Sequence, residues 1–196
     1  METDRPTVDL VDAEVIRPFT RAALLAALLG ATAYAAIPIP FSPVPVTLQV
    51  LVVFLAGIFL GPYWGTLSIV LYLVAGALGA PVFSGGSAGL GHLVGQNAGY
   101  LWSYPFATVL IGFVVHRGRE LRNPVETSIP ILVVTLIIAT ALIYAMGVAW
   151  LAHVLDLGYL EAVSIGAAPF VVGEAFKIAA AVAIVKSGEI VPIRSS

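Results

Sequence analysis

Two ionisable side chains of opposite charge, Glu174 and Lys177, interrupt the apolar run VVGEAFKIAAAVAIV. Residues three apart on a helix project about 60° from each other, so the carboxylate and the ammonium share one face. A charge near the centre of a bilayer costs at least about 2.5 kcal/mol and tends to face the interior of a helical bundle. The pair is therefore either a salt bridge that locks the helix or the wall of a binding site. Because buried ion pairs add little net stability relative to apolar replacements, we favour a binding site.

Such a site would take an anionic group on the ammonium and N–H donors on the carboxylate. Further polar side chains lie in apolar surroundings and could bind amide-like or ureide-like groups: Thr47, Gln49, Ser84, Ser87, Gln96 and Asn97. Each of them could instead cap a helix or bond to the backbone. Asn97 is the strongest candidate for a cap, because a predicted helix begins close after it.

Several catalytic and metal-binding chemistries are excluded. Cysteine is absent, and the three histidines are too scattered for a metal site. The run GGSAG resembles the serine setting of an intramembrane protease, but no histidine on a later helix is placed to face that serine. The chain also lacks a Walker-type phosphate loop. We expect no catalytic residue, no metal, no cofactor and no nucleic-acid partner.

The composition predicts the elements that position these residues. The chain is 60% hydrophobic and only 10% charged, with a mean hydropathy of +1.02, which is typical of an integral membrane protein. We predict a six-helix all-α membrane domain over 19–186, between a polar tail at 1–18 and a short tail at 187–196. The predicted spans, each of about 20 apolar residues, are 19–37, 46–61, 63–80, 99–116, 129–152 and 166–186.

Two connections are unusual. The segment IPIPFSPVPV cannot be a regular helix because its prolines fix φ and remove backbone donors. The run APVFSGGSAGLGHLVGQNAG is either a flexible loop or, as we favour, a folded cap over a pocket. Apart from Lys177, the lysines and arginines lie in three groups at one predicted side: Arg5, Arg17 and Arg21, then Arg117, Arg119 and Arg122, then Lys186 and Arg194. The two unusual connections and the connection 153–165 carry none. The positive-inside rule therefore predicts cytoplasmic termini, with both unusual loops on the outer side.

Small residues form a stripe along the first predicted helix, with overlapping four-residue spacings among Ala22, Ala23, Ala26, Ala27, Gly30 and Ala31. This spacing permits close approach between helices in lipid. The stripe is expected either to pack within the bundle or to dock a separate membrane subunit. Of its members, Ala22, Ala26 and Gly30 are the candidate docking residues.

Four motifs in a fixed order, PVPVTLQ, GxxxGPxxG, GAPVFSGG and PFVVGEAFK, carry a resemblance that covers roughly residues 20–186. With them the chain resembles the BioY family, the biotin-binding S components of energy-coupling factor transporters. It departs from the family pattern in GQNAGY, where Gln96 and Asn97 replace proline and threonine. Glu174 stands where the family commonly has aspartate, and Leu101 stands where some members have arginine.

The resemblance implies a six-helix S-component bundle in the plasma membrane that binds biotin near the outer surface. Glu174, Lys177 and Ser87 would line the site, joined by the amides of Gln49 and Asn97 and an apolar wall that includes Tyr100 or Trp102. It further implies partners: a membrane coupling subunit, docked on the alanine-rich first helix, and two ABC-type ATPases that drive the toppling of the S component. The alternatives are an S component for another small vitamin and a structural membrane protein without a ligand.

Overall fold

The computed structural model describes residues 13–118 and 120–189, and their regular structure is helical, with no β-element beyond two isolated bridges. The six α-helices are α1 Ala13–Thr32, α2 Gln49–Ala77, α3 Ala98–His116, α4 Ile129–Leu155, α5 Tyr159–Gly166 and α6 Val171–Ser187. Short 3-10 turns, η1 Ser84–Gly86, η2 Leu90–Leu93, η3 Pro124–Glu126 and η4 Ala168–Phe170, lie between them. The predicted all-α class is confirmed.

Five helical stretches of the described residues are long and apolar enough to cross a membrane, namely α1, α2, α3, α4 and the stretch Tyr159–Ser187 that contains α5 and α6. The chain is therefore a multi-pass membrane protein. The count of six spans, the side on which the termini lie and the bounds of the two tails stay predictions.

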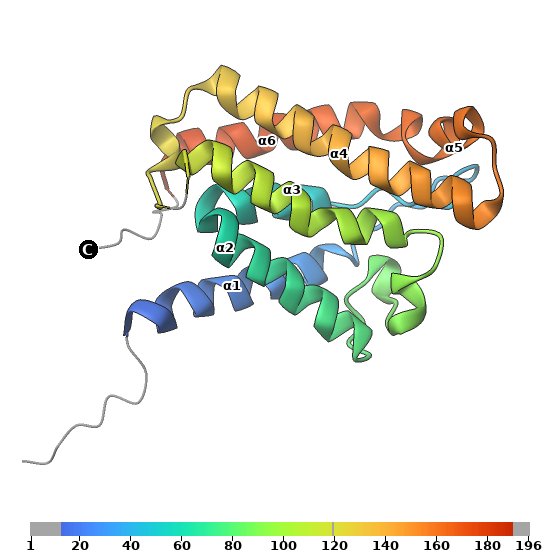
Figure 1. The fold of residues 1–196 in the computed structure, drawn as a ribbon, viewed down its shortest axis with the longest axis horizontal. Helices are drawn as coiled ribbons and strands as arrows, with labels where there is room; N and C mark the ends of the chain where they lie inside the picture. The colour runs from blue at the N-terminus through green and yellow to red at the C-terminus, as the bar shows by residue number, and fades with distance from the viewer. Residues whose placement is uncertain (1–12, 119, 190–196) are drawn as a thin grey trace, which may run out of the picture.

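The longest of the α-helices, α2, breaks at Gly61, whose φ of 73° and ψ of −172° are not helical. Pro62 follows directly and begins the second arm without needing a backbone donor. The two arms approach closely beyond the turn, because a Cβ on Gly65 would lie 2.5 Å from the carbonyl oxygen of Ala56. The turn lies where the sequence predicts a break between two spans, and Figure 1 shows the resulting bend.

The helices pack as a bundle around α3, which lies between α2 and α4 (Figure 1). The helix α1 packs against α2, and α6 lies alongside α4. The large, fully buried side chains of the core come mainly from the three central helices, including Phe54, Ile58, Ile69, Ile111, Leu132 and Leu136. Most of the surface of α1 is exposed, so this helix is the one least enclosed by the rest of the chain.

The two unusual connections lie at the same end of the bundle, as predicted (Figure 1). The glycine-rich run is tied to the residues that follow α1, because the backbone N–H of Gly85 donates to the carbonyl of Ala33. The described cations other than Lys177 lie in the first half of α1 (Arg17, Arg21), in the connection that follows α3 (Arg117, Arg122) and in the last turn of α6 (Lys186). Figure 1 shows these segments at the opposite end of the bundle. Arg5, Arg119 and Arg194 lie outside the described residues.

Several helix bounds differ from the sequence-based expectation, and the first helix ends at Thr32 where the prediction extends it to residue 37. The first helix begins at Ala13, inside the segment assigned to the polar tail, because the charged side chains there do not prevent a helix from forming before it becomes apolar. The segment predicted as the connection 153–165 contains the helix α5, which begins after Gly158. Asp156, in the left-handed conformation with φ of 52°, ends α4 just before it.

Candidate ligand site

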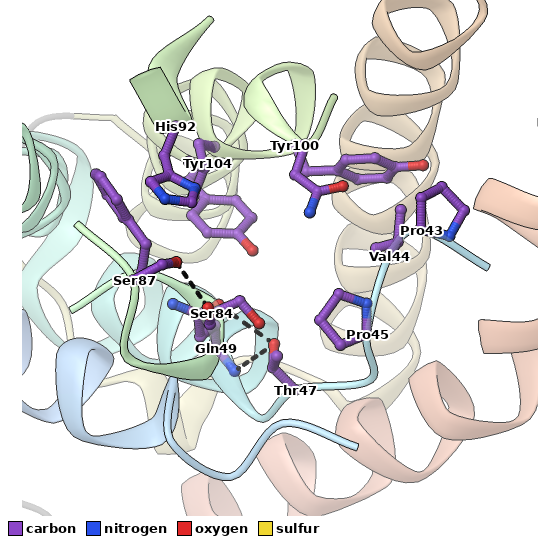
Figure 2. A pocket seen from close by; sticks show the side chains of 13 residues that line it. Pro43, Val44, Pro45, Thr47, Gln49, Ser84, Ser87, His92, Tyr100 and Tyr104 are labelled. Atoms are coloured by element: carbon purple, nitrogen blue, oxygen red, sulfur yellow. Dashed lines mark hydrogen bonds between the residues drawn. The ribbon is translucent and has the colours of Figure 1, made fainter. Parts of the chain in front are cut away.

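A cavity of about 270 Å³ opens at the loop end of the bundle (Figure 2). Three separate parts of the chain supply its walls: the proline-rich segment with the start of α2, the glycine-rich loop, and the first turns of α3. Its lining residues are Pro43, Val44, Pro45, Thr47, Gln49, Phe83, Ser84, Ser87, His92, Asn97, Tyr100, Leu101 and Tyr104. Gln49, Ser87, Asn97 and Tyr100, all predicted as site residues, are thus brought together.

The proline-rich wall is not helical, as its prolines require, and it folds back on itself through a turn at residues 40 and 41. Ile37 and Val46 pair across the segment through backbone hydrogen bonds of 2.8 and 2.9 Å. The hydroxyl of Ser42 donates to the carbonyl of Ile165 over 2.7 Å, so the segment is also tied to α5. These bonds hold Val44 and Pro45 against the cavity although the segment has no regular structure of its own.

The glycine-rich run is a folded cap, which confirms the interpretation that we favour over a flexible loop. Gly85 and Gly89 have φ of +70° and +97°, a region that residues with a Cβ rarely adopt. The backbone N–H of Gly89 donates to the carbonyl of Gly76 over 2.7 Å. The indole N–H groups of Trp102 and Trp150 donate to carbonyls of the same loop, at Leu93 and Gly95.

Trp102 therefore fastens the cap and is not among the residues that line the cavity. Of the two residues expected for an apolar wall, Tyr100 lines the cavity and Trp102 does not, because the indole N–H of Trp102 finds its acceptor in the loop backbone. The hydroxyl of Tyr100 donates to the carbonyl of Gly166 over 2.8 Å, which leaves its ring as the surface that lines the cavity.

Glu174 and Lys177 line a second, smaller cavity of about 40 Å³ and not the larger one. The two cavities share a wall made of Val44, Pro45, Thr47, Tyr100 and Tyr104. Because the smaller cavity lies directly behind this wall, the charged pair adjoins the base of the larger cavity. The site is thus divided into an outer end at the loops and a deep end between the helices.

At the deep end both charged side chains are buried, with 3% of Glu174 and 7% of Lys177 exposed. The Nζ of Lys177 donates to Oε1 of Glu174 over 2.7 Å, and the hydroxyl of Tyr144 donates to the same oxygen over 3.0 Å. Oε2 of Glu174 has no partner among the described residues. A buried carboxylate oxygen without a hydrogen bond is costly, so the deep end is suited to a ligand that brings an N–H donor.

Several of the polar side chains at the outer end are already engaged. The hydroxyl of Thr47 donates to Oε1 of Gln49 over 3.4 Å. Nε2 of Gln49 donates to the hydroxyl of Tyr72 over 2.7 Å, and the hydroxyl of Ser87 donates to the carbonyl of Ser84 over 2.8 Å.

Asn97 precedes α3 but makes no capping hydrogen bond through its side chain. Its Oδ1 is buried without a partner among the described residues. The helix-cap explanation of Asn97 is therefore wrong, and its amide is available to a ligand.

Three further residues belong to the site although the sequence does not single them out: His92, Tyr104 and Tyr144. The tyrosines sit on helices that are apolar on all sides, so the sequence pattern does not show which way they face. His92 had a weak signal, since it lies inside the glycine-rich run. No cluster of metal-ligating side chains is present in the described part of the chain.

The predicted docking residues of α1 do not share one environment. Ala22 is fully buried, and a Cβ on Gly30 would lie 2.8 Å from the side chain of Val82. Both are therefore used in packing within the chain, which leaves them no side-chain surface for a partner in this conformation. Ala26 is half-buried. The exposed face carries a parallel set of small residues at the same four-residue spacing, Ala23, Ala27 and Ala31.

A family model described as the BioY family matches residues 3–192, nearly the whole chain. The chain belongs to the BioY family. It is 39% identical over 150 residues to a protein of Pyrococcus horikoshii named probable biotin transporter BioY, covering 76% of this chain and 83% of that protein. It is 34% identical over 170 residues to the biotin transporter BioY of Thermotoga maritima, and the match covers 86% of this chain and 94% of that protein.

A solved structure supports the same assignment. The fold matches a crystal structure described as the S-component for biotin from an ECF-type ABC transporter, with a TM-score of 0.80 and 26% identity, over 90% of this chain and 93% of that chain. Within the BioY pattern, the acid-x-x-lysine pair of this chain forms the deep end of the site. Leu101, where some BioY members have arginine, lines the larger cavity, so no arginine supplies a positive charge there.

Proposed function

We propose that this protein is the substrate-binding subunit of a biotin uptake system, which captures biotin from one side of the membrane and passes it across with an ATP-driven module. The observation that carries this function is the family membership, joined to a cavity whose base adjoins the acid and lysine of the BioY motif. As a transporter subunit the chain belongs to no enzyme family. The volume of about 270 Å³ is near the lower end of the range for small-molecule sites.

The chemistry of the two ends supports one orientation of biotin. The deep end presents a carboxylate with one unpartnered oxygen, and it attracts N–H donors and repels another carboxylate. Biotin has N–H donors on its ureido ring and an anionic carboxylate at the end of its chain. We therefore place the ureido ring toward Glu174, with Lys177 near its carbonyl oxygen, and the carboxylate toward the glycine-rich cap.

The wall between the two cavities needs to move only locally for this pose. Val44 and Pro45 lie between Ser42 and Val46, the positions at which hydrogen bonds anchor the proline-rich segment, and no helix hydrogen bonds hold these two residues. A shift of these two residues between their anchors would join the two cavities into one site that is long enough for the ring and the chain. Tyr100 and Tyr104, also on the shared wall, would contact the apolar bicycle.

The orientation in the membrane and the partners are part of the same proposal. The cationic end of the bundle would face the cytoplasm of the cell, so the cavity opens to the outside of the plasma membrane. A membrane coupling subunit would contact the exposed face of α1, and two ABC-type ATPases would supply the energy. The exposure of Ala23, Ala27 and Ala31 supports this contact.

Titration of the purified full-length protein with labelled biotin tests the function directly. We expect saturable binding that excess unlabelled biotin competes away and that an unrelated vitamin of similar size does not. No saturable binding at micromolar ligand, in protein shown to be folded, would contradict the proposal. Competition by the other vitamin alone would assign the site to a different substrate.

A further inference from the structure

The larger cavity has one lining residue that can carry a positive charge, His92. The other polar members of its lining are amides, hydroxyls and phenols, and no Asp, Glu, Lys or Arg lines it. The positive charge of Lys177 is compensated at 2.7 Å by Glu174 and lies in the adjoining cavity. An anionic group held in the larger cavity would thus meet one ionisable partner.

His92 is held where it can serve this purpose. It lies in η2, and its backbone N–H donates to the carbonyl of Gly89 over 3.1 Å. Its ring contacts that of the buried Phe83, with the ring centres 5.8 Å apart and the planes at 50°. Figure 2 shows the imidazole projecting from the glycine-rich cap toward the cavity, on the same side as Tyr104 and across from Gln49 and Thr47.

A purely structural role explains these observations less well. A histidine that only packs on Phe83 would be expected to lie in the core, whereas His92 is exposed. The ring contact would be served equally by an apolar aromatic side chain. The cap itself is held by bonds that do not involve the imidazole, from Gly85, Gly89, Trp102 and Trp150.

We propose that His92 is the residue that binds the ligand's carboxylate, and that protonation of its imidazole makes biotin capture by this chain stronger in mildly acidic surroundings. This inference rests on the proposed function and on the orientation that places the carboxylate at the cap. A charged imidazole donates a charge-assisted hydrogen bond to a carboxylate. Histidine is the side chain that ordinarily gains this charge between about pH 8 and about pH 5.

The other titratable groups that face this cavity do not produce the same dependence. They are the phenols of Tyr100 and Tyr104 on α3, which are neutral throughout this range. The proline-rich segment and the start of α2 contribute no ionisable group to the lining. The carboxylate of biotin stays ionised above about pH 5, so the charge of the ligand is constant.

The test is a set of binding titrations on the purified full-length protein at about pH 5.5 and about pH 8. We expect biotin to bind about tenfold more tightly at the lower pH, the effect of one charge-assisted contact. The amide of biotin, which has no negative charge, should bind equally at both values. If biotin and its amide showed the same pH dependence, the carboxylate would not be the group that His92 binds, and the proposal would be overturned.

Three variants complete the test. His92→Gln should abolish the pH dependence for biotin, with an affinity like that of the unchanged protein at about pH 8. His92→Arg, which keeps its charge at every pH used, should bind tightly at both values. His153→Gln alters another exposed histidine, near Trp150 and outside the lining, and should leave the dependence intact.

Tight biotin binding that is independent of pH in the unchanged protein, or a dependence that survives in His92→Gln, would overturn the role of His92 and leave the proposed function standing. Absence of biotin binding at both pH values would overturn the proposed function as well. Thermal unfolding of each variant at both pH values establishes that the compared proteins are folded.

Discussion

The deep and outer ends of the site are built in opposite ways. At the deep end, Glu174, Lys177 and Tyr144 all stand on long helices and already bond to one another. At the outer end, the groups that face the ligand lie on loops or at the start of a helix, and His92 and Asn97 make no side-chain hydrogen bond among the described contacts. The preorganised donors and acceptors of the deep end favour specificity for one ligand group. The side chains of the outer end, which loops carry, let the ligand enter and can adjust to its shape. Of the departures from the BioY pattern, Asn97 and Leu101 fall at the outer end, whereas the deep end keeps the acid-x-x-lysine motif with glutamate in place of aspartate.

The largest effect is expected when the charged pair is replaced as a unit. The double variant Glu174→Leu with Lys177→Met removes both charges and keeps the volume, so the fold should be as stable as before or more so. Biotin binding should fall by at least about 100-fold, because two charged hydrogen-bonding groups are lost. Isothermal titration and thermal unfolding without ligand measure the two properties separately. Undiminished binding would show that the pair is a structural bridge.

The single variant Lys177→Met serves as the companion experiment. It leaves Glu174 buried without its main partner, which by itself destabilises the protein. We expect biotin binding to weaken much more than the stability does. Equal losses of binding and of stability would favour the structural bridge over the binding site.

An intermediate effect is expected at the outer end. Asn97→Leu removes an amide that lines the cavity and has an unpartnered oxygen, so biotin binding should weaken about tenfold, the value of one good hydrogen bond. Gln96→Leu is the matched control, since Gln96 is exposed and does not line the cavity. The two variants should differ in affinity for biotin but not in thermal stability. Similar affinities would remove Asn97 from the site.

A smaller effect is expected from Tyr144→Phe, which deletes one of the two hydrogen bonds to Oε1 of Glu174. The ring contacts with Tyr100 and Phe170 would be kept. Biotin binding should fall about fivefold, because the carboxylate is held less firmly while the lysine still pairs with it. If the loss matched that of the double variant, the deep end would depend on the phenol as much as on the charges.

The smallest effect on binding is expected on α1, which lies outside both ends of the site. Ala27→Trp places a large ring on the exposed face of this helix and should leave biotin affinity unchanged in the isolated subunit. It should block co-purification with the coupling subunit, since the close approach of helices requires small residues. Ala141→Trp on the exposed surface of α4 is the control. An unchanged yield of the complex with Ala27→Trp would contradict the docking role of this face.

The sequence was sufficient to predict the parts of the fold that follow from composition and from proline and glycine. The break at Gly61, the non-helical segment around Pro43 and the placement of both unusual loops at one end are all confirmed, although the segment around Pro43 folds back on itself and is not extended. The pairing of Glu174 with Lys177 also follows from local spacing. These features depend on residues close together in the chain, where helix geometry is a sufficient guide.

The rest depended on the rotation of each helix, which the sequence does not determine when a helix is apolar on all sides. For this reason Tyr144 was not predicted beside Glu174, although its hydroxyl lies 3.0 Å from Oε1. The rotation of α1 was equally undetermined. Ala22 was therefore predicted to contact a partner subunit, whereas it is fully buried in the bundle. The position of His92 was not predictable because it is set by hydrogen bonds between distant segments of the cap.

The order of the site along the chain has a consequence for biosynthesis. The cap and the first turns of α3 leave the ribosome long before α6, which carries Glu174 and Lys177 and follows the other described helices in the chain. That helix enters the membrane carrying two charges, and Tyr144 on the already synthesised α4 offers a hydrogen-bond partner that lowers the cost of inserting them. The ability to retain biotin would therefore be acquired only when α6 has docked. Ligand retention would report on the insertion of α6, and would separate molecules in which this helix is in place from those in which it is not.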